Sequence, residues 1–148
     1  MSRLFLLLIL AATLIFGCSL EDQNDIDREL IQGYIQNNNI QAIEDPSGLF
    51  YTLDMPGGEE KPVLTDSVTM TYRGTLLDGF QFDASPADTT VTFLLNNLIP
   101  GWKIGIPKYG RGGAGTLIVP SVLGYGNRRV GNIPPNSVLI FDIELVDF

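Results

Sequence analysis

Hydrophobic positions change their spacing twice along the chain. From 4 to 16 the residues are almost continuously apolar, and polar residues follow directly after Cys18. Between 25 and 36 apolar residues recur every three or four positions, which is the spacing of one face of an α-helix. From Gly48 onward they alternate with polar residues in short runs, which glycines and prolines interrupt. This last pattern predicts strands and turns.

The helical spacing predicts one short amphipathic helix before the strands. It covers 25–36, and Asn24 or Asp25 is placed to cap its first turn, where acidic residues also interact favourably with the helix dipole. Three asparagines at 37–39 end the pattern. The helix could pack on the rest of the chain or on a second copy, and the sequence leaves both open. Its apolar stripe consists of Ile26, Leu30, Ile31, Tyr34 and Ile35.

Period-two alternation in the remaining sequence predicts an antiparallel sheet. Asp78 and Gly79 form a strong turn signal between strands. One short helix is expected over 100–106, with Trp102 near its first turn. These elements predict an α+β fold, in which the sheet has one solvated face and one face covered by the short helix. The expected strands are 49–54, 67–76, 115–119 and 139–145.

Composition and charge narrow the chemistry that the chain can perform. Its 148 residues suffice for one domain. The net charge is −8, without a lysine and arginine cluster, which argues against nucleic-acid binding. The chain has no histidine, one cysteine and no acidic calcium-binding loop, so no metal or cofactor is expected. Any chemistry must therefore use carboxylates, tyrosines, backbone groups and shape.

The apolar run at the start fits a secretory signal, because it is shorter than the about 20 residues that a transmembrane helix needs. Ile15, Gly17 and Cys18 resemble the bacterial lipobox, in which the cysteine is acylated and becomes the first residue of the mature chain. An ordinary cleaved signal and an uncleaved anchor are the alternatives. We expect lipidation of Cys18 and a location in the cell envelope, anchored to a bacterial membrane and facing the periplasm or the cell exterior.

Four short motifs follow one another in the second half of the chain. They are Tyr72-Arg-Gly with Asp78-Gly-Phe-Gln-Phe-Asp-Ala-Ser, Leu98-Ile-Pro-Gly-Trp, Leu117-Ile-Val-Pro-Ser-Val-Leu-Gly-Tyr-Gly and Ile133-Pro-Pro-Asn-Ser-Val-Leu-Ile-Phe-Asp-Ile-Glu-Leu. Each alone is common, but in this order and spacing they resemble the FKBP-type peptidyl-prolyl cis/trans isomerases over about 48–148. The resemblance implies a twisted antiparallel β-sheet wrapped around one short α-helix. Together with the lipobox and the helical pattern, it predicts a lipoprotein signal peptide at 1–17, a tether with the amphipathic helix at 18–45, and an FKBP-type domain at 46–148.

The resemblance further implies an apolar pocket between helix and sheet that accepts a prolyl ring. Proline-containing polypeptides would be the substrates, and macrolide inhibitors of the family are possible ligands. Val91 stands where some members carry an additional phenylalanine. By correspondence the catalytic residues would be Tyr72, Asp83, Tyr125 and Phe141, and the substrate-binding residues would be Phe82, Leu98, Ile99, Trp102 and Ile133.

The implied reaction makes and breaks no covalent bond, which suits a chain without histidine. Rotation about a peptide bond meets a barrier of about 18–20 kcal/mol, because amide resonance is lost. A catalyst must bind the twisted amide better than the planar one, and an apolar pocket favours the less polar twisted form. We expect Asp83 to accept a hydrogen bond from Tyr72 and to set the local field, without transferring protons. Two alternatives are a proline-binding or chaperone module with weak catalysis, and an assembly protein that acts through the 26–35 helix.

Overall fold

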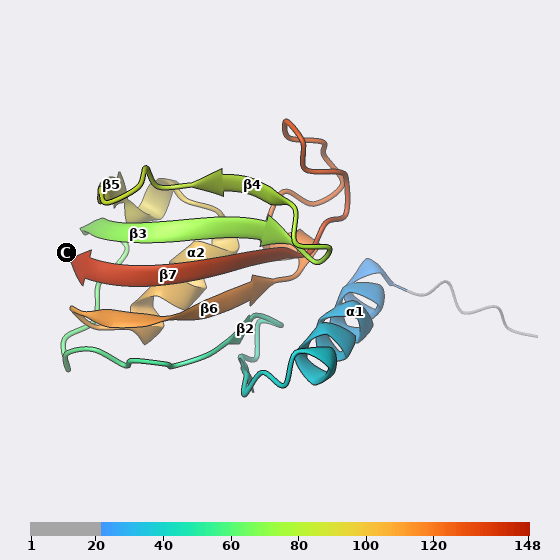
Figure 1. Cartoon of the computed structure of the whole chain (residues 1–148), viewed down its shortest axis with the longest axis horizontal. Coiled ribbons are helices and arrows are strands. Elements are labelled where there is room, and N and C mark those ends of the chain that lie inside the picture. Colours follow the sequence, from blue (N-terminus) through green and yellow to red (C-terminus); the bar gives the residue numbers. More distant parts are fainter. Residues whose placement is uncertain (1–21) are drawn as a thin grey trace, which may run out of the picture.

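The chain forms a seven-stranded antiparallel sheet with a short helix, α2, against one face and a longer helix, α1, near one end (Figure 1). The computed structural model describes residues 22–148, so the expected signal peptide and Cys18 lie outside the described residues. The elements are α1 (Gln23–Asn37), β1 (Ile43–Glu44), β2 (Phe50–Tyr51), β3 (Ser67–Leu76), β4 (Gln81–Ala84), β5 (Val91–Leu94), η1 (Leu95–Asn97), α2 (Pro100–Gly105), η2 (Ile106–Lys108), β6 (Gly113–Val119), η3 (Ser121–Leu123) and β7 (Leu139–Asp147).

The sheet has the order β1-β2-β6-β7-β3-β4, and β5 pairs with β3 beside β4. The last strand of the sequence, β7, therefore lies in the middle of the sheet, between β6 and β3. In this register Phe141 lies opposite Leu117 on one side and Gly74 on the other. The predicted α+β fold with a twisted antiparallel sheet around one short helix is confirmed.

Helix α2 lies very close to the sheet because it presents two glycines to strand β6. A Cβ atom at Gly101 would lie 2.5 Å from Cγ1 of Val119, and one at Gly105 would lie 2.7 Å from the methyl groups of Leu117. Both distances are shorter than real Cβ contacts, so the absence of side chains lets the helix backbone rest on the sheet. This packing brings Trp102 into the main core, where 4% of its surface is exposed.

Helix α1 packs on its own domain, which is one of the two packings that the sequence left open. Ile31 is fully buried, in a second cluster with Phe50, Ile118 and Ile140. Because Ile118 and Ile140 alternate with residues of the main core, this cluster lies on the face of β6 and β7 opposite to α2. Leu30 stays 47% exposed. Among residues 22–148, no helix combines the length and apolar character needed to cross a membrane.

Two expected boundaries were wrong. The first helix begins at Gln23 with Asp22 in the cap position, not Asn24 or Asp25, and no side chain caps it. The strand expected over 49–54 is reduced to Phe50–Tyr51. Both faces of this short strand are covered, so alternation did not predict its length. Beyond it the backbone continues irregularly beside β6: the Thr52 N–H donates to Thr116, and Met55 exchanges two backbone hydrogen bonds with Ala114.

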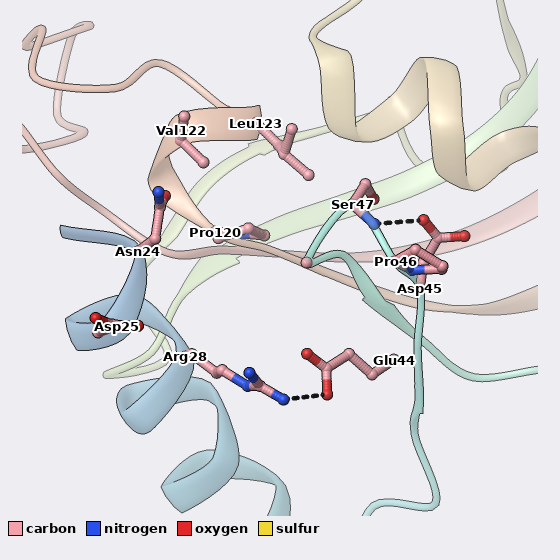
Figure 2. A pocket seen from close by; sticks show the side chains of 11 residues that line it. Asn24, Asp25, Arg28, Glu44, Asp45, Pro46, Ser47, Pro120, Val122 and Leu123 are labelled. Atoms are coloured by element: carbon pink, nitrogen blue, oxygen red, sulfur yellow. Dashed lines mark hydrogen bonds and ion pairs between the residues drawn. The ribbon is translucent and has the colours of Figure 1, made fainter. Parts of the chain in front are cut away.

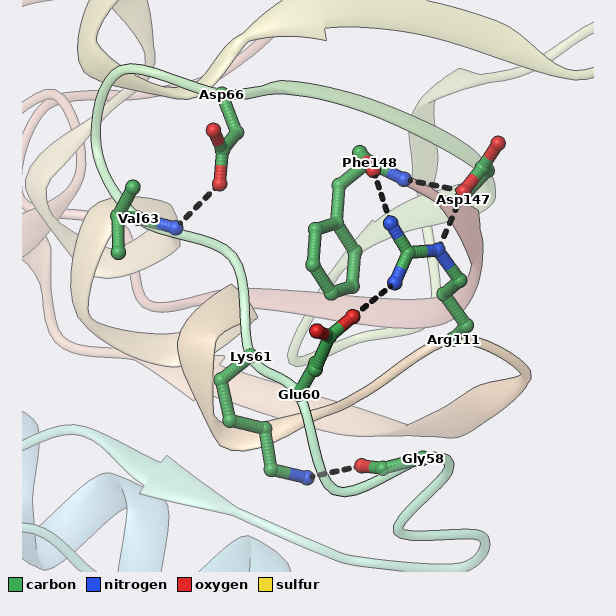
Figure 3. Close-up of polar contacts among 8 residues, drawn as sticks. All are labelled: Gly58, Glu60, Lys61, Val63, Asp66, Arg111, Asp147 and Phe148. Atoms are coloured by element: carbon green, nitrogen blue, oxygen red, sulfur yellow. Dashed lines mark hydrogen bonds and ion pairs between the residues drawn. The ribbon is translucent and has the colours of Figure 1, made fainter.

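Arg111 fixes the C-terminal end of the chain to the loop before β3. Its Nε donates to Asp147 at 2.6 Å and its Nη1 donates to Glu60 at 2.8 Å (Figure 3). The guanidinium also lies 4.1 Å from the centre of the Phe148 ring, within the range of a cation–π contact. The hydrogen bond from Arg111 lowers the pKa of Asp147. These contacts close the end of the sheet away from α1 (Figure 1).

Candidate functional site

A cavity of about 230 Å³ opens between α2 and the strands that carry the aromatic side chains. Two larger depressions border α1, and their linings mix charged and amide side chains with aliphatic ones. The smaller cavity has the apolar, aromatic lining that is usual for ligand sites. Its lining consists of Tyr72, Phe82, Asp83, Phe93, Leu98, Ile99, Trp102, Tyr125 and Phe141.

Trp102 forms the centre of the aromatic lining. Phe141 and Tyr72 stand nearly perpendicular to its indole, with ring centres 5.0 and 5.2 Å away, and Phe93 follows at 6.2 Å. Such edge-to-face pairs are favourable and fix the orientation of each ring. In the described part of the chain, the buried Nε1–H of Trp102 has no hydrogen-bond acceptor, which costs about 1–3 kcal/mol. The position of the indole at the base of the pocket is therefore maintained at some expense of stability.

Gly74 makes room for the opposite wall. A Cβ atom at this position would lie 2.7 Å from the Phe82 ring and 3.0 Å from the Phe141 ring. The two rings pack edge-to-face with centres 5.6 Å apart, directly over the glycine. Any side chain at Gly74 would therefore displace one of these rings, both of which line the cavity. The register that places Gly74 opposite Phe141 in β7 thus determines the width of the pocket.

Asp83 and Tyr72 form the polar rim of the pocket. The Tyr72 hydroxyl donates to Oδ2 of Asp83 at 2.7 Å, as the sequence analysis predicted, and the Ala84 N–H donates to Oδ1 at 2.9 Å. Burial of the phenol, followed by the hydrogen bond to Asp83, raises the pKa of Tyr72 well above its ordinary value. The Tyr72 hydroxyl is consequently a permanent donor near neutral pH, and Asp83 is a fixed acceptor on the rim.

Tyr125 approaches the pocket from the turn that follows η3. It is half-buried, and burial, with a smaller effect from the Asp83 charge, raises the pKa of its hydroxyl. Its neighbours Gly124 and Gly126 are the residues that bend the chain here, since Gly126 adopts a φ of 61°, in the left-handed region. The phenol of Tyr125 therefore keeps its proton and can donate to a carbonyl oxygen that enters the cavity.

The residues expected from the sequence come together here, with one exception and one addition. Ile133 does not line the cavity; it is buried in the main core that surrounds it. Phe93 lines the cavity and was not expected; it lies on β5, two residues after Val91 and on the same face. The alternation in Val91–Leu94 is too short to have identified this strand from sequence.

The arrangement supplies shape and fixed hydrogen bonds and lacks the groups of covalent chemistry. Among residues 22–148, no cluster of acidic or cysteine side chains could hold a metal ion. The cavity contains one carboxylate, two protonated phenols and otherwise apolar surface. Such a site can bind a small apolar ring and orient a neighbouring carbonyl group.

Comparisons with known proteins agree with this geometry. A family model described as FKBP-type peptidyl-prolyl cis-trans isomerase matches residues 58–146. FkpA of Buchnera aphidicola, a peptidyl-prolyl cis-trans isomerase of this type, is 36% identical over 137 residues, which cover 88% of this chain. The outer membrane protein MIP of Legionella longbeachae is 42% identical over 103 residues, or 68% of this chain. The crystal structure of Escherichia coli FkpA superposes with a TM-score of 0.74 and 35% identity over 85% of this chain.

The match covers only part of these relatives. The aligned regions are 54% of the Buchnera protein, 44% of the Legionella protein and 60% of the chain in the Escherichia coli structure. The chain therefore spans about half the length of the curated relatives that it matches.

Proposed function

The chain belongs to the FKBP-type peptidyl-prolyl cis-trans isomerases, and we propose that its aromatic pocket catalyses rotation about the bond that precedes proline in exported polypeptides. The observation that carries this proposal is the aromatic cavity around Trp102, bounded by the hydrogen-bonded pair of Tyr72 and Asp83. Its volume of about 230 Å³ suits a single prolyl ring with part of the preceding residue.

The pocket lowers the barrier by favouring the twisted amide. The prolyl ring packs against Trp102 and Phe141, and the carbonyl group of the preceding amide is transferred from water into the pocket. In the planar amide, resonance places partial charge on the oxygen and nitrogen, whereas the twisted amide is less polar. An apolar environment therefore destabilises the planar form relative to the twisted one. Only such differential binding accelerates the reaction.

One hydroxyl group would orient the substrate while it rotates, and a second would hold the rim of the pocket in place. Tyr125, which keeps its proton, donates to a substrate carbonyl at the mouth of the cavity. Tyr72 donates to Asp83, so that this carboxylate and the wall of β4 stay in place. No proton transfer is required, and the rate should not depend on the ionisation of a catalytic acid or base.

An isomerisation assay tests this proposal. The chain from Ser19 onward should accelerate the cis-to-trans conversion of a short X-Pro peptide, and a macrolide inhibitor of the family should compete with the peptide. Asp83→Ala should lower kcat/KM about tenfold, because the field and the wall position are lost together, while Asp83→Asn should lower it less than about threefold. Glu144→Gln, on the exposed outer side of β7, is the control of equal charge change.

Three outcomes would contradict the proposal. A folded protein without any acceleration would exclude the activity. Tight binding of the peptide with negligible turnover would favour the proline-binding module. A pH–rate profile with a titration that disappears in Asp83→Asn would show that Asp83 acts as an acid or base.

We also propose that residues 1–17 form a lipoprotein signal, that 18–45 tether the 46–148 domain, and that acylated Cys18 anchors it in the cell envelope, facing the periplasm or the exterior. The lipobox residues support this, as does a relative that is named an outer membrane protein. Cys18→Ala should release the protein from the membrane fraction, and mass spectrometry should find acyl chains on the wild-type N-terminus only. Membrane retention of Cys18→Ala would favour an uncleaved anchor.

A further inference from the structure

Asp27, in helix α1, is a fully buried carboxylate that lies outside the four motifs in the sequence. Its Oδ2 accepts two hydrogen bonds from one residue, Ser121: the backbone N–H donates at 2.7 Å and the hydroxyl donates at 2.6 Å. Its Oδ1 accepts a third bond from the Gln23 side chain at 2.7 Å. Because a buried hydrogen-bonding group that loses its partner costs free energy, the two hydrogen bonds from Ser121 fix α1 to η3.

Ser121 in turn holds both residues that flank Tyr125. Its carbonyl oxygen accepts the Gly124 N–H at 3.0 Å and the Gly126 N–H at 2.8 Å. The donors of Ser121 therefore point to Asp27, while its acceptor is used to bend the chain around Tyr125. Two successive hydrogen-bonded steps connect a carboxylate of α1 to a phenol that lines the pocket.

The surroundings leave this contact little freedom. Pro120 and Ser121 are buried, whereas Val122 is 56% exposed. The first residues of the segment 120–123 are therefore packed in the protein, and its outer side faces solvent. Figure 2 shows the first turn of α1 beside the segment from Pro120 to Leu123. An open cavity of about 650 Å³ borders both of them. Because solvent reaches the turn from that side, loss of the buried hydrogen bonds would allow η3 to move outward.

We propose that Asp27 is a positioning residue for Tyr125, and that helix α1 is therefore a functional part of the isomerase site. This inference rests on the proposed isomerase function. Asp27 does not touch the substrate. It determines where the Ser121 carbonyl lies, and through it where the Tyr125 hydroxyl can meet a substrate carbonyl.

Amide hydrogen exchange tests the structural half of the inference without any catalysis. Asp27→Ala should raise the exchange rates of Gly124 and Gly126 at least about tenfold, because their acceptor loses its support. Amides of β7, such as those of Ile143 and Leu145, report global opening and provide the reference. The matched control is Arg28→Ala, which removes the exposed Arg28–Glu44 ion pair from the same helix.

Kinetics tests the functional half. Asp27→Ala should lower kcat/KM about tenfold under conditions where the variant is fully folded, since small displacements of a positioning group cost that much or more. In a Tyr125→Phe background the same substitution should cost less than about twofold, because the hydroxyl it positions is already absent. Asp27→Asn should restore most of the rate, since its carbonyl oxygen can accept both Ser121 donors. If Asp27→Ala does not fold, Ser121→Ala is used in its place. This variant removes only the hydroxyl hydrogen bond, so its loss of kcat/KM should be smaller but in the same direction.

The outcomes separate the two proposals. A wild-type protein without isomerase activity would overturn the proposed function, while the exchange data would still test the contact. Exchange at Gly124 and Gly126 that rises no more than in Arg28→Ala, or only in parallel with β7, would overturn the positioning role. An undiminished loss of kcat/KM in the Tyr125→Phe background would overturn it as well.

Discussion

Two carboxylates in this protein accept a hydroxyl hydrogen bond of nearly equal length in opposite surroundings. Asp83 accepts from Tyr72 at 2.7 Å on the open rim of the pocket, and Asp27 accepts from Ser121 at 2.6 Å in the interior between α1 and η3. At the rim, water screens the charge and competes for the same lone pairs. In the interior no water replaces a lost partner, so the cost of breaking the contact is much larger.

The comparison teaches that the same local chemistry has different consequences for stability and for function. Asp83 lies at the site of the reaction and should matter for rate more than for stability. Asp27 should matter for stability first, and for rate through Tyr125. The other carboxylates of the protein differ in how far they are exposed. The following substitutions test whether a carboxylate contributes less to stability the more exposed it is.

The largest effect is expected for Asp27→Ala. It leaves the Ser121 N–H and hydroxyl without an acceptor in a buried position, which should lower the free energy of unfolding by about 3 kcal/mol. Urea unfolding measures this, with Asp25→Ala on the exposed side of the same helix as control. A loss below about 1 kcal/mol would mean that water enters the site and replaces the carboxylate.

Asp45 should give the next largest effect, visible as a pH dependence. The hydrogen bond from Lys108, at 2.6 Å, lowers the pKa of Asp45 to about 2 from an ordinary value of 3.8. The folded state then binds fewer protons than the unfolded state, so its stabilisation is complete above about pH 4 and is lost as the pH falls toward 2. It should amount to about 1–2 kcal/mol, because the Asp45 side chain is only 14% exposed.

The measurement is the difference in unfolding free energy between wild type and Asp45→Asn at several pH values. The difference should be largest near pH 6 and should shrink as the pH falls from 4 to 2. A difference that stays constant over this range would show that ionisation of Asp45 does not contribute.

Asp83→Ala should change stability by less than about 1 kcal/mol, because the pair with Tyr72 is open to solvent. The same protein should show the loss in kcat/KM expected above, so rate and stability separate at this residue. Thermal unfolding and the isomerisation assay on one preparation check this. A stability loss comparable to that of Asp27→Ala would show that the rim pair is not screened.

The smallest effect is expected for Arg73→Gln. Arg73 pairs with Asp142 at 2.7 Å on the exposed face of the sheet, where their side chains are 61% and 45% exposed. Exposed pairs contribute about 0–1 kcal/mol and less at high salt. The free energy of unfolding is measured at low salt and at 1 M salt. The difference between wild type and variant should disappear at 1 M salt. A salt-independent difference would point to packing of the arginine stem.

The sequence could predict a feature when neighbouring residues determine it, and could not when it depends on a partner far away in the chain. The long alternations of β3 and β7 and the prolines and glycines of α2 identified the sheet, the short helix and the position of Trp102. Asp83 was found because it follows a recognisable turn. Asp27 looked like an ordinary acidic residue in a first helical turn, since nothing local indicates that its partner is 94 residues away. Phe93 was missed for the same reason, because only the pairing of β5 with β3 turns it toward the pocket.

The two glycines of α2 suggest how the depth of the binding cavity could vary among related chains. Trp102 follows Gly101, and a methyl group at Gly101 would meet Val119 at 2.5 Å. Adding that methyl would lift the tryptophan platform away from the sheet and make the cavity shallower, although every side chain in contact with the ligand would be unchanged. Gly101 thus supports the base of the cavity from behind the binding surface, out of reach of any comparison restricted to the residues that line it.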